Sequence, residues 1–261
     1  MTRPGELDTA PSPASFPPLV CLIFKQDSYQ QSRKEHKVLS TTVYPDQSGK
    51  SLIAGKDIPE WIFEFNGYRC PFLIIGYRMG RLAIEKLGLT KENSYEMFVF
   101  SEMGIAHPQI KMIDGVQAAT GATYGKGQLF RLDYGKPAVT FYFPGKSALR
   151  IHIKNEFLDG AGKFEYMKYR KQGVKNAEIP PQPADEMINF ASETPLDEIF
   201  EVKEISGFTY EGLKASFNKA KCEICGEYTF ERYLRNRNGK LVCIPCSHYE
   251  EEEKKALAFQ I

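Results

Sequence analysis

The sequence predicts an α+β fold, with helices packed on an antiparallel sheet, followed by a small cysteine-rich module. Three observations lead to this prediction. Apolar side chains recur at helical intervals between residues 71 and 88. Three short apolar runs between residues 128 and 153 are separated by turn sequences. Four of the six cysteines lie between residues 222 and 246. A chain of 261 residues can hold one sizeable core and a small second module.

Charge and hydropathy exclude some classes of function. The formal net charge is +1, so no overall field directs the chain toward nucleic acid or an anionic membrane. The early apolar run at 19–24 is too short for a bilayer, which needs about 20 apolar residues. No small-residue cleavage site follows this run. We therefore expect a cytoplasmic protein with no membrane attachment.

The N-terminal segment and the domain limits follow from composition. Residues 1–17 are rich in Pro, Ser, Thr and Ala, which predicts a disordered tail. We expect an α+β core over 18–205, including a basic and Pro-rich spacer near 163–183, and the cysteine module over 206–261. Short strands are expected at 19–24 and 41–44.

Helices are predicted from apolar spacing and from their end signals. One covers 58–65, and a longer one begins at Pro71, which suits a first helical position, and ends near Gly88. Gly76 and Gly80 on this helix would allow another backbone to approach closely. Further helices are expected from about 110 to Gly121 and near 184–191.

The strands predict the sheet. A strand is expected within 95–103, and then three more at 128–132, 138–143 and 148–153. The last three are joined by Asp-Tyr-Gly-Lys and Pro-Gly-Lys, which are turn sequences. We expect these three strands to form an antiparallel meander beside the helices.

The C-terminal module has the spacing of a zinc finger. Two Cys-x-x-Cys pairs, separated by seventeen residues, supply the four thiolates that Zn²⁺ prefers, at Cys222, Cys225, Cys243 and Cys246. A Cys-x-x-Cys redox motif belongs in a thioredoxin-like βαβ context, which the sequence lacks. The sequence predicts the three parts of a treble clef. They are a knuckle at the first cysteine pair, a hairpin at Asn238-Gly239, and a helix over 247–259 with Cys246 at its N-terminus. We expect one structural zinc ion per chain.

The finger also carries basic and aromatic residues, which raises the question of its partner. They are Arg232, Arg235, Arg237 and Lys240, interleaved with Tyr228, Phe230 and Tyr233. The acids Glu223, Glu227, Glu231 and the run at 250–253 nearly cancel this charge. The sequence therefore favours scaffolding or a protein partner over nucleic acid, which stays an alternative.

The stretch "TGATYGKG" at 120–127 has the glycines and lysine of a phosphate-binding loop. Its spacing is wrong, however: three residues separate Gly121 from Gly125-Lys126, and Gly127 replaces the hydroxyl that would hold Mg²⁺. A helix precedes the loop and a strand follows it, the reverse of a P-loop. The loop is therefore not predicted to bind nucleotide.

Cys70 has two interpretations. As the residue before the helix at Pro71, it would lie at the positive end of a helix dipole, which lowers a thiol pKa and suits a nucleophile. Such a nucleophile needs a base, and His36, His107 and His152 are the histidines outside the finger. Alternatively, Cys70 is a small buried apolar group.

The ordered motifs resemble one known family, the FmdE family of formylmethanofuran dehydrogenase proteins. They are Gly67-x-x-Cys70-Pro71, Gly76-Tyr77-Arg78-x-Gly80, Asp114-Gly-Val-Gln117, the loop at 120–127, Asp133-Tyr-Gly-Lys136, Phe141, the run at 195–202 and Cys222-Glu-Ile-Cys225-Gly-Glu227. The resemblance runs from about residue 56 to the C-terminus. It implies an α+β core, a treble-clef finger, frequent dimers and a link to the molybdenum or tungsten enzymes of methanogenic C1 metabolism.

The chain departs from this family where the family would place metal or thiol groups. The family pattern looks like His-Gly-His-x-Cys-Pro-Gly, and this chain has Asn66, Tyr68 and Phe72 in place of the two histidines and last glycine. Ala122 replaces the cysteine of Thr-Gly-Cys-Thr, and Lys111 replaces another cysteine. Among these positions, Cys70 alone keeps its thiol.

Three hypotheses follow. The first is a zinc-containing accessory or small-molecule-binding protein that has lost most of the core ligands. The second is an enzyme with a rearranged core site, for which the candidate pocket residues are Asn66, Tyr68, Cys70, His107, Thr123 and Lys126. The third is a regulatory adaptor that contacts protein or nucleic acid through the finger.

Overall fold

A computed structural model describes residues 58–90, 96–212 and 214–249. The predicted tail at 1–17, the strands at 19–24 and 41–44, and most of the predicted helix at 247–259 lie outside these residues. In the described part of the chain, no helix is long and apolar enough to cross a membrane.

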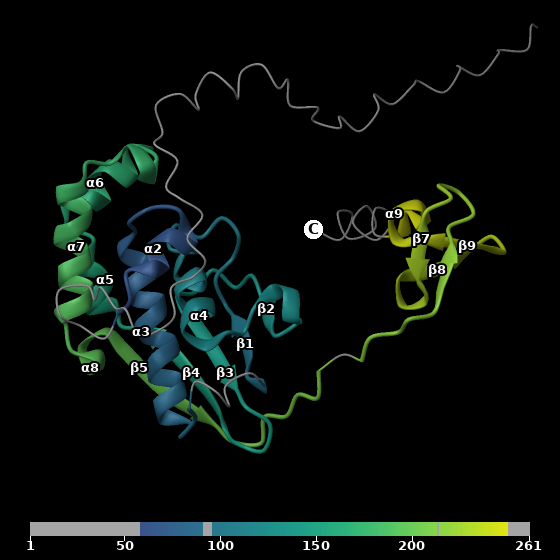
Figure 1. The fold of residues 1–261 in the computed structure, drawn as a ribbon, viewed down its shortest axis with the longest axis horizontal. Helices are drawn as coiled ribbons and strands as arrows, with labels where there is room; N and C mark the ends of the chain where they lie inside the picture. Colours follow the sequence, from purple (N-terminus) through teal and green to yellow (C-terminus); the bar gives the residue numbers. More distant parts are fainter. Residues whose placement is uncertain (1–57, 91–95, 213, 250–261) are drawn as a thin grey trace, which may run out of the picture. The chain divides into compact units, whose positions relative to one another are not determined.

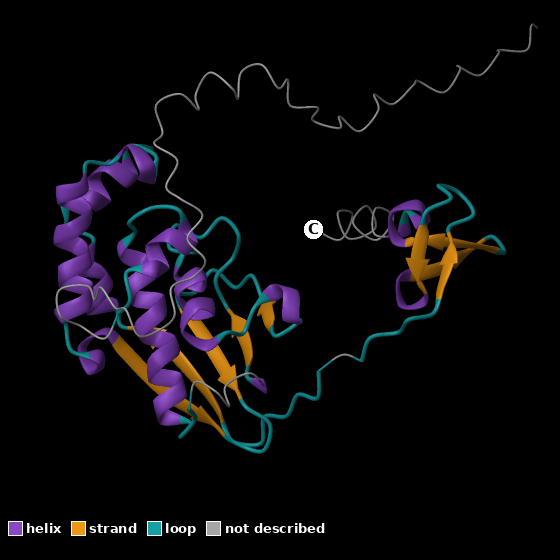
Figure 2. Cartoon of the chain, in the orientation of Figure 1, coloured by secondary structure: helices purple, strands orange, loops and turns teal. Residues whose placement is uncertain are grey.

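The core is an α+β domain, as the sequence predicts (Figures 1 and 2). Its helices are α2 (Trp61–Asn66), α3 (Pro71–Lys86), α4 (Met112–Thr120), α5 (Asn155–Ala161), α6 (Glu165–Lys171), α7 (Pro181–Glu193) and α8 (Leu196–Ile199). Its strands are β1 (Phe98–Ser101), β2 (Leu129–Arg131), β3 (Ala138–Tyr142), β4 (Ala148–Ile153) and β5 (Phe200–Ile205). Short 3₁₀ turns, η4 (Tyr124–Lys126) and η5 (Asn176–Glu178), precede β2 and α7.

The sheet is mixed, and this corrects the predicted meander. Its order is β2-β1-β3-β4-β5, and β2 runs parallel to β1 rather than antiparallel to β3. Parallel neighbours need a long crossover, usually through a helix. Here α4 supplies it, because the chain passes through α4 between β1 and β2. The other neighbouring pairs, β1–β3, β3–β4 and β4–β5, are antiparallel.

The two faces of the sheet have different coverings. One face, with side chains such as Val99, Phe141 and Ile151, belongs to the main core together with the helices. The other face carries a group of aromatic rings on β1, β2 and β3. Phe208 and Tyr210, from the segment after β5, pack on this group at ring-centroid distances of 5.1 Å from Tyr142 and 5.2 Å from Phe100. Both faces of the central strand β3 are therefore covered, and all its residues are buried.

Helices α3 and α4 pack so closely that their backbones leave no room for side chains between them at three glycines. A Cβ atom at Gly76 would overlap the carbonyl oxygen of Met112, and one at Gly115 would overlap that of Leu73. A Cβ at Gly80 would lie 2.7 Å from the Cβ of Ala119. The close approach predicted from Gly76 and Gly80 is confirmed, and α4 is the helix that makes it.

The predicted spacer near 163–183 is wrong as a description of this region. It contains α6, whose Tyr166 is 1% exposed, and the first turn of α7, which begins at Pro181. Because α6 is rich in charged residues, the sequence gives little indication that one of its aromatic rings is buried. The C-terminal end of α7 is tied to α3, because the Arg78 guanidinium donates hydrogen bonds to the carbonyl oxygens of Ala191 and Thr194.

A bidentate ion pair joins β4 to the residue that follows β1. The Arg150 guanidinium donates to both carboxylate oxygens of Glu102, at 2.6 and 2.9 Å. The Glu102 side chain is 8% exposed and that of Arg150 is 27% exposed. The hydrogen bond from Arg150 holds the pKa of Glu102 below its usual range.

Replacing Glu102 by glutamine is expected to lower the free energy of unfolding by about 2 kcal/mol at pH 7, because the charged hydrogen bonds are lost. A lowered folded-state pKa contributes stability that is present above the unfolded pKa and lost as the pH falls. The difference between wild type and Glu102→Gln should therefore narrow as the pH falls below about 4.3, the usual pKa of an unfolded glutamate. Urea unfolding followed by Trp61 fluorescence measures it. Glu178→Gln, which breaks the exposed pair with Lys175, is the control and should change little. A gap that does not depend on pH would contradict the assignment.

The finger consists of two ribbons and one short helix. Strands β6 (Lys219–Lys221) and β7 (Tyr228–Phe230) form one antiparallel pair, and β8 (Leu234–Arg237) and β9 (Lys240–Cys243) form the other. The turn η6 (Glu231–Tyr233) joins the ribbons, and α9 (Ile244–Ser247) follows β9. The small hydrophobic cluster of the finger consists of Val242 and the cysteines around it.

Candidate functional site

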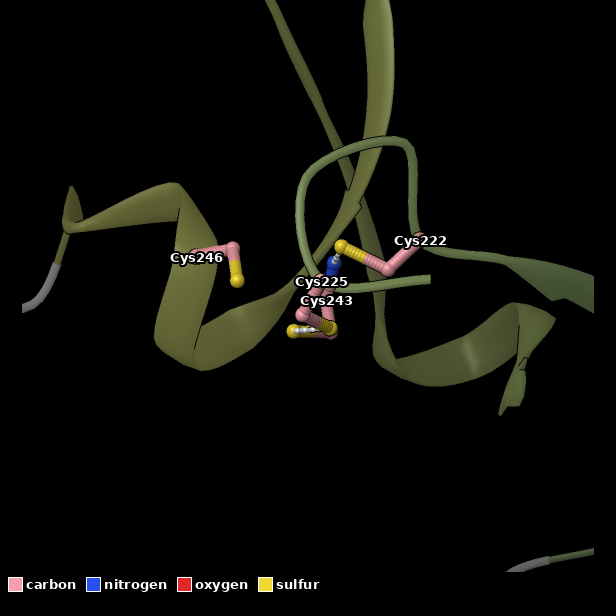
Figure 3. A group of neighbouring side chains, drawn as sticks. All are labelled: Cys222, Cys225, Cys243 and Cys246. Carbon is pink, nitrogen blue, oxygen red and sulfur yellow. Dashed lines mark hydrogen bonds between the residues drawn. The ribbon is translucent and has the colours of Figure 1, made fainter. Parts of the chain in front are cut away.

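The four finger cysteines come from three elements and point toward one another (Figure 3). Cys222 and Cys225 lie on the turn after β6, Cys243 ends β9, and Cys246 lies inside α9. Cys243 immediately precedes this short helix as its N-cap. The predicted helix over 247–259, with Cys246 at its N-terminus, lies mostly outside the described residues and stays a prediction. Gly226 has a φ of +77°, which only glycine adopts readily, and it lets the turn close after Cys225.

The thiol geometry fits a tetrahedral metal ion. All four sulfur atoms lie within 4.8 Å of one another, and those of Cys225 and Cys243 are 3.9 Å apart. A tetrahedron with Zn–S bonds of about 2.3 Å has sulfur atoms roughly 3.8 Å apart. Backbone N–H groups of Cys225 and Cys243 lower the pKa of the Cys222 thiol to about 6, whereas hydrogen bonds among the thiols raise the pKa of Cys246 to about 12. Among the described residues, these four form the one cluster of possible metal ligands.

Cys70 has the position that the sequence predicts, and its surroundings bear on its two interpretations. It precedes Pro71 as the N-cap of α3, and it is fully buried. Burial raises the pKa of the Cys70 thiol, and this effect outweighs the hydrogen bond with Tyr166 and the backbone N–H groups of the first turn. These observations favour the second interpretation, in which Cys70 is a small buried group.

A chain of hydrogen bonds connects Cys70 to Tyr68. The Cys70 sulfur lies 3.7 Å from the hydroxyl of Tyr166, which donates to the side-chain oxygen of Asn176 at 2.9 Å. The Asn176 amide donates to the hydroxyl of Tyr68 at 2.9 Å, and the side chain of Asn66 donates to the Tyr68 carbonyl. Sequence reasoning missed Tyr166 and Asn176, because both lie in the stretch that it treats as a spacer.

Lys111 joins the same group of residues. Its ammonium lies 4.6 Å from the centroid of the Tyr68 ring, a cation–π contact. Its charge also acts on the Cys70 thiol. The positions 68, 70 and 111, which are far apart in the sequence, thus meet at the N-terminal end of α3. We call Tyr68, Cys70, Lys111, Tyr166 and Asn176 the core polar cluster.

The other candidate pocket residues make their described contacts inside their own loops. The Nδ1 atom of His107 accepts a hydrogen bond from the backbone of Gln109, and burial lowers the His107 pKa. The backbone carbonyl of Thr123 accepts hydrogen bonds from the backbone N–H groups of Lys126 and Gln128. The Lys126 ammonium donates to the Gly121 carbonyl at 2.7 Å, which closes the glycine loop on itself. Nothing in these contacts assembles the six predicted pocket residues into one site.

The fold and the cysteine cluster define the class: an α+β protein that carries a four-cysteine finger. The chain belongs to the family described as "FmdE, Molybdenum formylmethanofuran dehydrogenase operon", whose model matches residues 65–204, more than half of the chain. A second model, "Prokaryotic dksA/traR C4-type zinc finger", matches residues 215–252. The predicted family and the predicted zinc-finger domain are confirmed.

Two known proteins are similar to this chain. One is a "Probable S-adenosyl-L-methionine-binding protein" of Archaeoglobus fulgidus, 29% identical over 191 residues, which cover 70% of this chain and 50% of that protein. The chain thus spans about half the length of this relative. The other, known from a crystal structure, is a "tungsten formylmethanofuran dehydrogenase subunit e (fmde)-like protein" from Syntrophus aciditrophicus. Its identity is 20% and its TM-score 0.44, over 72% of this chain and 88% of that chain.

Proposed function

We propose that this protein is a zinc-containing accessory or small-molecule-binding member of the family, linked to molybdenum or tungsten C1 metabolism. Family membership and the four-thiol cluster support the proposal. The finger would be a treble clef with one structural zinc ion per chain, in a cytoplasmic protein that forms homodimers. We do not propose S-adenosylmethionine as the ligand, because this chain matches only half of the Archaeoglobus fulgidus protein whose name refers to it.

The observation that carries the proposal is the chemistry of the core polar cluster. Lys111 stands where the resemblance places a cysteine, and Tyr68 stands where it places a histidine. The fold brings both together with Cys70, which suits a shared ligand site in relatives that keep those groups. In this chain an ammonium takes the place of a thiolate, and it repels a metal cation instead of donating electrons to it. The core of this chain would then hold no metal ion at these positions.

An enzyme that uses Cys70 is the less favoured hypothesis. A nucleophilic thiol must be accessible and must form the thiolate near neutral pH. Cys70 is fully buried, and its pKa is raised. Its hydrogen-bond partner is a tyrosine whose own pKa is raised, so Tyr166 does not serve as a base near pH 7. Both observations favour a structural thiol.

Metal analysis tests the proposal. We expect about one zinc ion per chain in the purified protein, close to none in Cys222→Ser, and an unchanged ratio in Cys70→Ala. Iodoacetamide should modify Cys70 of the native protein slowly at pH 7 and rapidly once it is unfolded. A second metal ion that is lost in Cys70→Ala but kept in Cys222→Ser would show that the core holds metal, and the proposal would fail.

A further inference from the structure

One face of the β6–β7 ribbon combines two lysines with two aromatic rings. In the ladder, Lys219 lies opposite Phe230, and Lys221 lies opposite Tyr228. Directly opposite residues of an antiparallel pair share a face, as do residues two apart on one strand. The four side chains therefore form a single surface, which we call the lysine–aromatic face.

The lysine–aromatic face is open. Tyr228 is 64% exposed and Phe230 is 46% exposed, and both lysines are exposed. The ammonium groups of Lys219 and Lys221 lie 4.8 and 5.4 Å from the centroid of the Tyr228 ring. Within the described part of the chain, neither lysine forms an ion pair with a carboxylate, and both ammonium groups contact the exposed Tyr228 ring.

The arginines that the sequence singles out are already engaged within the finger. Arg232 donates to the carbonyl of Lys214, and Arg235 donates to the carbonyls of Arg232 and Leu234. Arg237 lies over the Tyr249 ring. Arg232 and Arg235 thus use part of their hydrogen-bonding capacity within the finger, whereas the contacts described for Lys219 and Lys221 are with the Tyr228 ring.

Two of the acids expected to cancel the positive charge are likewise engaged. The Glu223 carboxylate accepts a hydrogen bond from the Leu241 backbone, and the Glu231 carboxylate accepts one from the Ser216 hydroxyl. A hydrogen bond of this kind does not remove the charge of a carboxylate, but neither acid belongs to the paired residues that form the lysine–aromatic face. The charge balance of the whole module does not describe this face, which bears two lysines and no acid of its own.

We propose that the lysine–aromatic face binds single-stranded nucleic acid, a partner beyond the function proposed above. Stacking on Tyr228 and Phe230 would hold two bases, and Lys219 and Lys221 would contact phosphates. Residues two apart on a strand are about 7 Å apart, roughly twice the 3.4 Å rise between stacked bases. Neighbouring bases therefore fit both rings only when they are unstacked, which a single strand allows and a duplex opposes. An acidic protein segment would match the lysines but leave the rings without stacking partners.

Fluorescence anisotropy tests this proposal with the full-length, zinc-loaded protein and a labelled oligothymidine of about 15 nucleotides. Wild type should bind this single strand more tightly than the matching duplex. The double variant Tyr228→Ala/Phe230→Ala should weaken binding by at least about tenfold at constant salt. The double variant Lys219→Gln/Lys221→Gln should reduce the slope of log K against log salt by about 1.4, or roughly 0.7 for each lost phosphate contact.

Lys240→Gln is the matched control, because Lys240 is an exposed lysine on the other ribbon, and its salt slope should stay close to that of wild type. The zinc content of every variant verifies that the finger is folded. The proposal would be overturned by no binding, by equal affinity for the duplex, or by a slope in Lys240→Gln as low as in the double lysine variant. Competition by polyglutamate as strong as that by unlabelled oligothymidine would assign the face to acidic protein segments and would also overturn it.

Discussion

Replacing Gly115 by alanine is expected to lower the free energy of unfolding of the core by about 3 kcal/mol. The added methyl group would meet the Leu73 carbonyl, which belongs to the backbone of α3 and cannot rotate away as a side chain could. The two helices would have to separate, and α3 is the most extensively buried helix of the core. A loss of this size is a large part of the roughly 5–15 kcal/mol that usually stabilises a domain.

The sign of the change in stability distinguishes Gly115 from an ordinary helix glycine. In an exposed helix interior, changing glycine to alanine stabilises the protein by up to about 1 kcal/mol. Gly125→Ala is the matched control, since a Cβ there has open space and its backbone is not left-handed. Urea unfolding, followed by the fluorescence of Trp61, reports on the core, because the chain's one tryptophan lies in α2. Equal stability of Gly115→Ala and Gly125→Ala would contradict the close helix packing.

Local sequence signals predict the helices and strands of the core well, but they do not predict which distant segments pair or pack together. The helix at Pro71, the strands at 138–142 and 148–153, and the glycines of α3 all follow from spacing and end signals. The parallel position of β2 does not, because a strand of three residues carries little information about its partner. Nor does the packing of Phe208 and Tyr210 on the sheet, because aromatic residues in a segment without regular structure do not indicate what they cover.

The two candidate sites also differ in how far the sequence predicts them. Two Cys-x-x-Cys pairs identify the finger ligands by spacing alone, because the turn and the metal impose that spacing. The core polar cluster joins residues from four separate parts of the chain, and the sequence has no pattern that links Tyr166 and Asn176 to Cys70. The departures from the family pattern still located part of this cluster, at Tyr68 and Lys111.

Removal of zinc is expected to unfold the finger and leave the core folded. The hydrophobic cluster of the finger contains Val242 and cysteines, and burial of one valine contributes only about 2 kcal/mol. Structural zinc in small fingers contributes about 10–16 kcal/mol of apparent binding free energy at pH 7. We therefore expect the metal to be the main source of stability in this module, whereas the core has an extensive cluster of its own.

Amide hydrogen exchange before and after chelation measures this difference directly. Residues 219–247 should lose their protection, while α3 and β3 keep theirs and the Trp61 fluorescence stays unchanged. Cys222→Ser should behave as the chelated protein does without any chelator, because a hydroxyl is a poor substitute for a thiolate ligand. Cys70→Ala also removes one thiol but should keep the finger protected, since Cys70 belongs to the core. Protection of β8 and β9 that survives chelation would show that side-chain packing, rather than the metal, holds the finger together.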